Sequence, residues 1–538
     1  MAKLPKFCIF VAAVLCSGFM SPPVVSGAKI MLAMSGVMNS VSQHILFSAI
    51  TEPLVERGHE VILLAPQYKV TKGLTEEAVT GKIFFKNSKT KEEMEEMAAG
   101  LQSIALGFSQ DSVFQIIGRV RTIFPWFTEG CFQLFKDQET LDRLREERFD
   151  LILTMPTCGC DSLLAEYLGV PFVVMTPLRR APFFNEDTFG IPAPSSYVPF
   201  SGLTTFTDQM TFSQRITNVI MRYVTEPFFM YLTRSGLDQI QKDHNIRPDL
   251  SIDQLLGKAQ LWLSQGNWAF EFAQPITPNF VSIGGITTQS PKPLPKEMND
   301  FVEGSGDHGI IVFTLGSVVS SLMNDELNEN LAKVFSELPQ RVLWRLKGTR
   351  PRNLGNNTLV SDWLPQSDLL GHPKTKLMIY HGGANGINEI VTHGVPVLVM
   401  PLAGDQMGNA VRMQAKGMGF PIDKNTLTEE SFREAVNEML NNPKYTVNAK
   451  KASAIMKDQI VPVREKVVYY IEHILEFGGD HLRTRALELN FIQRESIDVI
   501  AFFLIVFISF FLAVKWLVCK CCGLCRRKHT ETRKSKSD

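Results

Sequence analysis

The chain has 538 residues, a formal net charge of zero and 20% charged residues. That length is enough for two domains with substantial cores, and the balanced charge argues against a nucleic-acid-binding protein. No nucleic-acid partner is therefore expected.

The N-terminus predicts a secretory signal peptide over residues 1–27. Two lysines precede an apolar run from Phe7 to Phe19, and small residues follow up to Gly27. This is the layout of a cleavable signal. The alternative, a buried first helix, is disfavoured because "SPPVVSG" would break it.

Residues 28–283 have the pattern of a first α/β domain. "AKIMLAM" reads as a buried strand, and a helix is expected around Ser42 to Arg57, before the strand of "RGHEVILLAP". Later, "FDLILT" and "VPFVVMT" flank the helical pattern "DSLLAEYLG". These repeats predict βαβ units of the doubly wound, Rossmann-like kind.

The stretch from about residue 101 to 242 is richer in Phe and Met at helical spacing. "RVRTIFPWF" and "VIMRYVTEPFFMYL" could line an apolar acceptor cavity or contact the membrane. Ordinary helical core is the simpler alternative. If the first alternative holds, a bound acceptor would be small and lipophilic.

The Pro- and Gly-rich residues 284–301 predict an inter-domain linker, after which a second α/β pattern covers residues 302–475. "GIIVFTLGS" reads as strand and turn, and "RVLWRL" as a strand after a helix near Asn324 to Leu338. Two sheets of this type, facing each other, would leave a cleft between them.

The most informative segment is "YHGGANGINE", Tyr380 to Glu389, in this second half. An apolar run precedes it, and Gly394 and the run "VPVLVMP" follow it, which predicts strand, turn, helix and parallel strand. Free amides at such a helix start suit a phosphate. None of the expected strand-to-helix turns carries G-x-G-x-x-G or a Walker lysine loop, so a nucleotide-sugar diphosphate is preferred over a dinucleotide or ATP.

The C-terminus predicts a single membrane span at residues 497–518, after a juxtamembrane segment at 476–496. The basic tail, residues 519–538, should be cytosolic, with everything before the span lumenal. Lys534 and Lys536 are fifth and third from the end, which resembles a dilysine retrieval signal for the endoplasmic reticulum.

Cysteine usage predicts few disulfides. Of nine cysteines, only Cys131, Cys158 and Cys160 lie in the expected lumenal part. The cluster "CKCCGLC" follows the span, where palmitoylation is more plausible than a zinc site without His ligands. "NNT" at Asn356 is a glycosylation sequon, which predicts a glycoprotein.

The run from Trp363 to Gly419, "WLPQSDLLGHPKTKLMIYHGGANGINEIVTHGVPVLVMPLAGDQMGNAVRMQAKGMG", resembles the signature of the UDP-glycosyltransferase family. Weaker similarity extends over almost the whole chain and is closest to the animal membrane-bound enzymes. The resemblance implies the GT-B fold, with two Rossmann-like domains facing a cleft. It also implies inverting transfer of a hexosyl or glucuronosyl group from a UDP-sugar to a small lipophilic acceptor in the endoplasmic reticulum.

The resemblance assigns donor-binding roles to ten residues. They are Trp363 at the uracil, Gln366 at the uracil or ribose, Glu389 at the ribose, His381, Gly383, Ala384, Asn385 and Ser317 at the diphosphate, and Asp405 and Gln406 at the sugar. No metal and no cofactor is expected, since the UDP-sugar is a co-substrate. Membrane enzymes of this kind often self-associate, so a homo-oligomer is a possible assembly.

The catalytic pair of the family is altered in this chain. The family's base is a His fourteen residues before the Arg of "RGHE", and its partner is an Asp that ends the strand of "FDLILT". A gapless alignment places Gln43 and Met155 at these two positions. His44 is adjacent and is the candidate base if the preceding loop is one residue shorter. Asp161, six residues after Met155, is expected to face elsewhere on its helix.

Three interpretations follow. The first is an active transferase with His44 as an imperfectly oriented base. The second is a transferase for acceptors that need little base assistance, such as amines. The third is a non-catalytic or weakly active UDP-sugar-binding membrane protein. The intact donor motif favours the first two.

Overall fold

The computed structural model describes residues 27–35, 41–67, 73–90, 92–93, 128–156, 159–177, 186–200, 204–234, 236–316, 325–402 and 404–534. The expected signal peptide, apart from Gly27, and the candidate phosphate ligand Ser317 lie outside these residues. The chain forms one compact unit up to Arg483 and a second unit from Thr484 onward.

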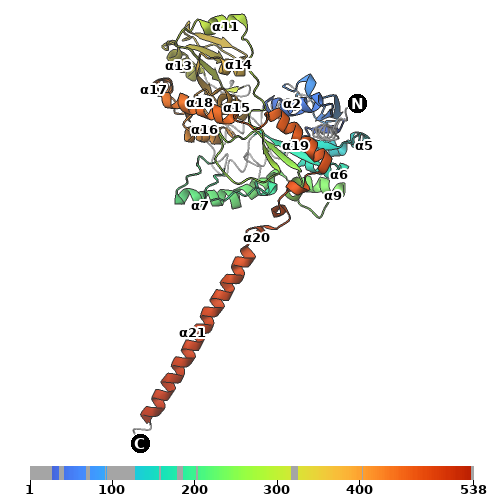
Figure 1. Cartoon of the computed structure of the whole chain (residues 1–538), viewed down its shortest axis with the longest axis vertical. Helices are drawn as coiled ribbons and strands as arrows, with labels where there is room; N and C mark the ends of the chain where they lie inside the picture. The colour runs from blue at the N-terminus through green and yellow to red at the C-terminus, as the bar shows by residue number, and fades with distance from the viewer. Residues whose placement is uncertain are drawn as a thin grey trace, which may run out of the picture. The chain divides into compact units, whose positions relative to one another are not determined.

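The first unit contains two parallel sheets (Figure 1). The seven-stranded sheet has the order β3-β2-β1-β4-β5-β6-β7, and the six-stranded sheet has the order β10-β9-β8-β11-β12-β13. The strands of the first are β1 (Lys29–Ala33), β2 (Glu60–Pro66), β3 (Gly81–Phe85), β4 (Leu151–Thr154), β5 (Phe172–Thr176), β6 (Leu261–Ser264) and β7 (Phe280–Ser282). Those of the second are β8 (Ile310–Thr314), β9 (Arg341–Arg345), β10 (Thr358–Ser361), β11 (Thr375–Tyr380), β12 (Val397–Val399) and β13 (Gly419–Pro421).

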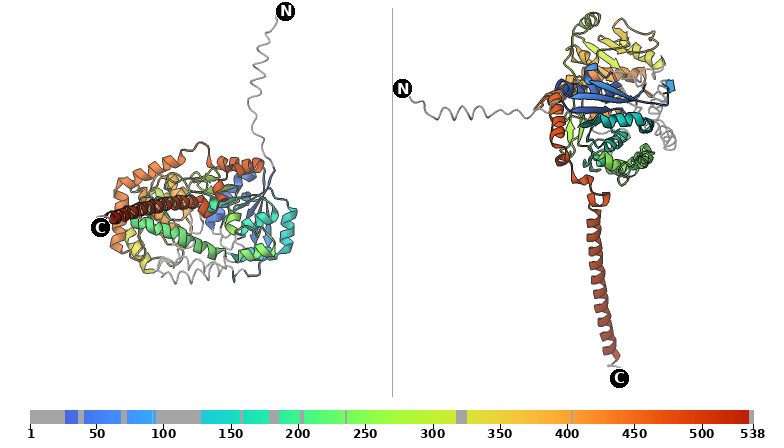
Figure 2. Two further views of the ribbon diagram at one scale, coloured as in Figure 1. Left: turned by 90° about the horizontal axis from the view of Figure 1, so that it is seen from below. Right: turned by 90° about the vertical axis from the view of Figure 1, so that its right-hand side faces the viewer.

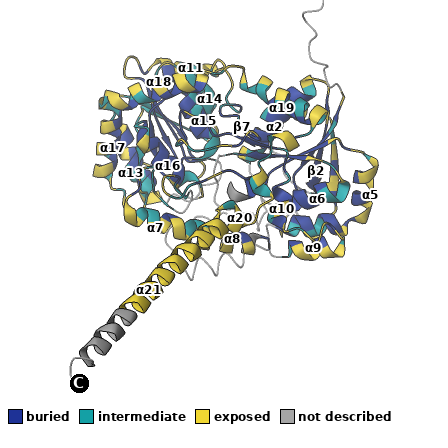
Figure 3. Ribbon diagram, turned by 60° about the horizontal axis from the view of Figure 1, so that its bottom comes forward, coloured by how far each residue is buried: buried dark blue, intermediate teal, exposed yellow. Residues whose placement is uncertain are grey.

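Each sheet has an apolar cluster on both of its faces, and alternate strand residues belong to one cluster or the other. Helices therefore cover both faces of each sheet. The helices of the first half are α2 (Val41–Glu56), α5 (Gln138–Glu146), α6 (Cys160–Leu168), α7 (Phe212–Ile220), α8 (Glu226–Thr233), α9 (Leu237–Asp243) and α10 (Ile252–Leu256). Those of the second half are α11 (Lys296–Glu303), α13 (Asp325–Ser336), α14 (Gln366–Gly371), α15 (Ala384–His393), α16 (Gln406–Ala415), α17 (Glu429–Asn441) and α18 (Pro443–Lys457). Figure 3 shows the central strands of both sheets as buried, and the edge strands β3 and β10 are less so. This confirms the predicted pair of Rossmann-like domains.

The helix α19 (Val463–Phe477) belongs with the first sheet, although the sequence assigned it to the second domain, 302–475. Its residues Val467 and Ile471 are part of the same apolar cluster as β1 and α2. Arg57 also forms an ion pair with Glu472 at 3.2 Å. The second domain therefore ends structurally after α18. The apolar face of α19 is buried against α2 of the first domain rather than against the helices that precede it in sequence.

The expected linker, residues 284–301, is only partly a connection. The helix α11 begins inside it at Lys296, and Met298 and Phe301 pack against the core of the second sheet. Proline and glycine mark the irregular residues before Lys296. The apolar spacing of "EMNDFV" instead produces α11, a helix of the second domain.

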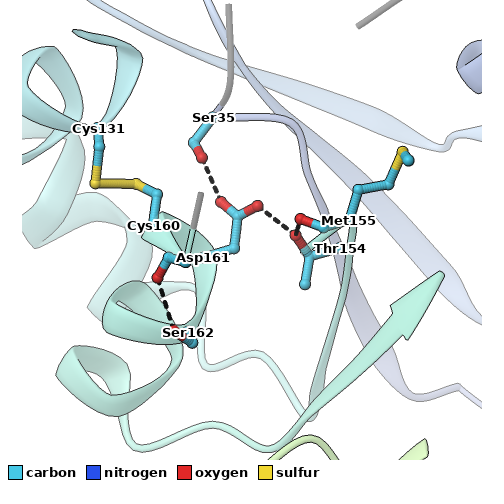
Figure 4. The surroundings of a disulfide bond; sticks show 8 residues. Ser35, Cys131, Thr154, Met155, Cys160, Asp161 and Ser162 are labelled. Carbon is cyan, nitrogen blue, oxygen red and sulfur yellow. Dashed lines mark hydrogen bonds between the residues drawn. A yellow bond between two sulfur atoms is a disulfide. The ribbon is translucent and has the colours of Figure 1, made fainter. Parts of the chain in front are cut away.

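One disulfide, Cys131–Cys160, is present in the described residues, with the two Cα atoms 5.6 Å apart (Figure 4). It joins the helical residues 128–136 to the first residue of α6. Cys158 lies outside the description. The bond therefore ties down the start of the helix that carries Asp161.

The second unit contains α20 (Phe491–Arg494) and the long helix α21 (Ile497–Lys534), which Figure 2 shows as one continuous helix. The stretch Ile497–Cys522 is long and apolar enough to cross a membrane, and none of its apolar window is buried against protein. This is the predicted transmembrane helix, and α21 continues beyond the predicted end at residue 518.

Candidate functional site

The turn between β11 and α15 is built as an anion cradle. β11 ends at Tyr380, and α15 begins at Ala384 after the N-cap Gly383, which provides no side-chain cap. The first amides of the helix are therefore left for a ligand or solvent. At Gly382, φ is +94° and an added Cβ would lie 3.0 Å from Val399 Cγ1. Glycine is required there, because the turn passes this close to the next strand.

His381 lies at the centre of this turn. Added Cβ atoms at Gly316 and Gly383 would come within 2.7 and 2.6 Å of its ring, so two glycines make room for the imidazole. Burial lowers the pKa of His381 to about 4, against a weaker opposing hydrogen bond to the backbone of Thr314. His381 is therefore a neutral imidazole at neutral pH.

A second polar cluster lies along α15 and the start of α14. Gln366 Nε2 donates a hydrogen bond to Glu389 Oε2 at 2.5 Å, although the two residues are 23 positions apart. Burial raises the pKa of Glu389 to about 7, despite the hydrogen bond from Gln366. The pair joins two elements of the sequence motif at one edge of the sheet.

Trp363 stands at the same edge with 65% of its surface exposed. The guanidinium of Arg345, at the end of β9, lies 5.1 Å from the centre of its ring. Because Arg345 contacts one face of the indole and most of Trp363 is exposed, the remaining surface of the indole can stack on a planar ring of a ligand. Arg345 belongs to the predicted strand "RVLWRL", to which the sequence assigned no binding role.

The "GDQ" segment reaches this site from the start of α16. Burial raises the pKa of Asp405 to about 6, although Asn409 and Arg412 oppose this shift. Gln406 Oε1 accepts a hydrogen bond from the amide of Leu402 at 2.7 Å. Asn409 donates to Asp405 Oδ2 at 2.7 Å and to the carbonyl of Gly382 at 2.8 Å. Asn409 therefore joins the "GDQ" segment to the anion cradle.

The first domain meets the cradle through α2. Asn385 Nδ2, in the first turn of α15, donates to the carbonyl of Ser42 at 2.8 Å. His44 follows two residues later, is 1% exposed, and has its ring 6.5 Å from that of Phe47. Gln43 is half-buried. The predicted base and the predicted anion site therefore belong to contacting segments.

The two candidates for the partner of this base lie on opposite faces of the first sheet. Met155 is buried in the apolar cluster of α2, with Leu46 and Phe47. Asp161 is buried at the start of α6 and accepts hydrogen bonds from Ser35 and Thr154. Figure 4 shows the side chain of Met155 pointing away from the Asp161 carboxylate. The sheet face towards α2 therefore carries the thioether of Met155, whereas the family pattern expects a carboxylate that orients the base.

No group of three or more His, Cys, Asp or Glu with the arrangement of a metal site occurs among the described residues. The polar groups of the cradle are amides, a neutral imidazole and carboxylates held by amides.

Comparisons with known proteins agree with this architecture. The family model "UDP-glucoronosyl and UDP-glucosyl transferase" matches residues 33–536. The chain is 35% identical to UDP-glucuronosyltransferase 2C1 of Oryctolagus cuniculus, over 91% of this chain and 97% of that protein. It is 34% identical to UDP-glucuronosyltransferase 2B7 of Homo sapiens, over 91% and 92% of the two chains.

Solved glycosyltransferases share the fold. The glycotransferase of kitacinnamycin superposes with a TM-score of 0.58 at 18% identity, covering 84% of this chain and 99% of that one. The calicheamicin glycosyltransferase CalG4 gives a TM-score of 0.55 at 14% identity, with the same two coverages. These likenesses confirm the GT-B fold. With the family model matching nearly the whole length, the chain belongs to the UDP-glycosyltransferase family and is a membrane-anchored enzyme of glycosyl transfer from UDP-sugars.

Proposed function

We propose that the anion cradle at the start of α15 holds the diphosphate of the UDP-sugar and drives its departure. The amides at the start of α15 carry this proposal, because the N-cap residue Gly383 makes no side-chain cap to them. Gly383, Ala384 and Asn385 supply the backbone amides. Neutral His381 donates to the phosphate from Nδ1, which has no hydrogen-bond partner among the described residues, in its Nδ1–H tautomer. Ser317, outside the described residues, is proposed to add a phosphate contact.

The remaining donor contacts follow from the same placement. Trp363 stacks on the uracil, and Gln366 and Glu389 bind the ribose edge, where a carboxylate accepts two hydroxyl hydrogen bonds. Asp405 and Gln406 bind the sugar hydroxyls. No metal or cofactor takes part, since amide dipoles and the imidazole stabilise the charge that develops on leaving UDP.

The transfer itself is an inverting displacement. An acceptor oxygen or nitrogen attacks the anomeric carbon, the bond from that carbon to the β-phosphate oxygen breaks, and UDP leaves. His44 takes the acceptor's proton. With Met155 facing α2, this base has no carboxylate from that position, so acceptors that give up a proton easily are favoured. The non-catalytic alternative is not favoured, because the chain belongs to a family of transferases.

We place the enzyme in the endoplasmic reticulum membrane, with both α/β domains lumenal and the basic tail cytosolic. The Cys131–Cys160 disulfide and the exposed sequon at Asn356 support an oxidising, glycosylating compartment. Exposed apolar side chains support a lipophilic acceptor or contact with lipid. They include Phe212 on α7, Tyr231 on α8, and Val224 in the π-helical turn Met221–Thr225 between these helices. Glucuronosyl or hexosyl transfer is proposed from the named relatives, and self-association into a homo-oligomer is an additional expectation.

Binding of UDP is expected to release a proton from Glu389. The free carboxyl has a pKa of about 7, and the ribose hydroxyls favour the ionised form, so binding lowers that pKa and expels a proton near pH 6.5. Calorimetry in two buffers of different ionisation enthalpy measures this release. In Glu389→Gln the release from this group should vanish and affinity should fall roughly tenfold or more. Equal proton release in both proteins would contradict the prediction.

The proposed function is tested in microsomes that contain the full chain. UDP-glucuronic acid, UDP-glucose, UDP-N-acetylglucosamine, UDP-galactose and UDP-xylose are each offered with phenol, amine and sterol acceptors, and products are identified by mass. Loss of phenol transfer in His44→Ala, with amine transfer retained, would support His44 as base. Retention of both would point to transfer without a base. No product with any pair, alongside retained UDP-sugar binding, would overturn the proposed transfer.

A further inference from the structure

The geometry points to Arg412 and Glu271 as positioning residues for the donor sugar, acting from the domain interface through Asn409. Neither residue belongs to the sequence motif's assigned site. The inference rests on the proposed function, because it assumes that Asp405 binds the sugar of the UDP-sugar.

The two residues form a buried ion pair between the domains. Arg412 Nε, on α16, lies 3.0 Å from Glu271 Oε2, in the segment between β6 and β7. Their side chains are 6% and 5% exposed, and the guanidinium lies 5.7 Å from the centre of the Phe270 ring. A carboxylate of the first domain thus pairs with a guanidinium of the second, and both side chains are largely buried.

The guanidinium of Arg412 is linked to the proposed donor site through the side-chain amide of Asn409. Arg412 Nη1 donates to Asn409 Oδ1 at 3.1 Å. Asn409, which is fully buried, uses its amide nitrogen for the carbonyl of Gly382 and the carboxylate of Asp405. A flipped amide would turn its oxygen toward two acceptors and its nitrogen toward a guanidinium. Arg412 therefore fixes the one orientation of Asn409 that holds both the cradle and the sugar carboxylate.

Stability alone does not explain the pair. Moving two charges out of water is unfavourable, and proteins in which a buried ion pair is replaced by apolar side chains of similar volume are often at least as stable. Glu271 Oε1 also has no hydrogen-bond partner within the described chain, which adds to this cost. A role in orienting Asn409 accounts for charges that packing does not require.

The charge of Arg412 also bears on the ionisation of Asp405. Asn409 and Arg412 both lower the pKa of this carboxyl, which burial raises to about 6. Among the described residues, Tyr380 on β11 also interacts with Asp405, and it is neutral at physiological pH because burial raises its pKa. Removing the positive charge should therefore leave Asp405 protonated at a higher pH.

The test compares binding of UDP with binding of UDP-glucuronic acid and UDP-glucose, in full-length protein in detergent. Arg412→Met should leave UDP affinity within about threefold of wild type but reduce the additional affinity for the transferred UDP-sugar by roughly tenfold. The acid limb of the kcat/KM profile should move to higher pH. Arg412→Lys keeps the positive charge but cannot contact Glu271 and Asn409 with separate guanidinium nitrogens. Its affinity for the UDP-sugar should therefore lie between those of wild type and Arg412→Met.

A double variant separates positioning from folding. Glu271→Leu with Arg412→Met leaves no unpaired buried charge, so the protein should unfold at a temperature close to that of wild type. The proposal expects its UDP-sugar preference to stay lost. Recovery of that preference in the double variant would show that the pair serves folding alone and would overturn the proposal.

Arg433→Met is the matched control, because Arg433 forms exposed ion pairs with Glu337 and Glu429 on the same domain. It should behave as wild type. If wild type binds and transfers a UDP-sugar while the Arg412 variants keep its preference, this inference fails and the proposed function stands. If wild type binds neither UDP nor a UDP-sugar, both fail.

Discussion

Replacing His381 by alanine is expected to lower kcat by roughly 100- to 1000-fold, the usual effect of removing a donor that stabilises developing negative charge. The imidazole lies between Gly316 and Gly383 at the start of α15, where the diphosphate would acquire charge as the glycosidic bond breaks. Donor KM should change much less than kcat, since the amides of α15 and the uridine contacts remain.

The effect of this substitution should not depend on pH in the neutral range, because His381 does not change its charge there. Burial lowers the pKa of His381 to about 4, so the ring stays neutral above that pH and becomes cationic only below it. The ratio of wild-type to His381→Ala kcat/KM, which reports the ionisation of the free enzyme, should therefore be constant between pH 5.5 and 8. A ratio that rises as the pH falls through 6.5 would mean that the imidazolium is the active form.

His393→Ala is the control for this variant. His393 lies on the same helix, but at its C-terminal end, where Nε2 is 3.1 Å from Ser367 Oγ. It should retain wild-type kcat within about threefold, because it contacts no proposed donor group. Retention of more than about a fifth of kcat in His381→Ala would remove the imidazole from the mechanism.

Replacing Met155 by aspartate is expected to raise the rate with hydroxyl acceptors by roughly 10- to 100-fold. Met155 is buried beside Leu46 and Phe47, the residues that follow His44 on α2. A carboxylate on this face would accept the imidazole N–H and stabilise the imidazolium formed during proton transfer. Amine acceptors, which need less proton removal in the attack, should gain little.

Two further variants decide whether the gain comes through His44. In the Met155→Asp/His44→Ala double variant, the gain should disappear, since the carboxylate then has no imidazole to orient. Met155→Asn keeps the size without the charge and should gain less. Burying an acid in an apolar cluster is also expected to cost stability, about 1–3 kcal/mol, which thermal unfolding would measure. An equal gain in the double variant would falsify the role of His44.

The proposed donor and acceptor groups are unequally equipped. The cradle and the proposed uridine and sugar ligands lie close to one sheet edge. The proposed base His44 lies on α2, in contrast, and the sheet face towards α2 carries the thioether of Met155. On this proposal, the chain provides for departure of the leaving group more completely than for activation of the acceptor.

Local patterns in the sequence were sufficient for the architecture. Alternating apolar strands and helices, with a glycine stop such as Gly394 after α15, predicted two doubly wound sheets, since those signals depend on neighbouring residues. "YHGGANGINE" predicted a strand, a tight turn and an uncapped helix, which β11 and α15 confirm. The apolar run near the C-terminus predicted the transmembrane helix for the same reason.

Tertiary packing decided what depends on distant residues. The apolar stripe of α19 fits the first domain as well as the second, and only its burial against α2 assigned it. Met155 and Asp161 are six positions apart, but the sheet between them decides which one faces α2. The buried contact of Arg412 with Glu271 brings two domains together, and neither partner has a local signal that names the other. Such pairings arise from the free energy of burying complementary groups, which sequence spacing does not encode.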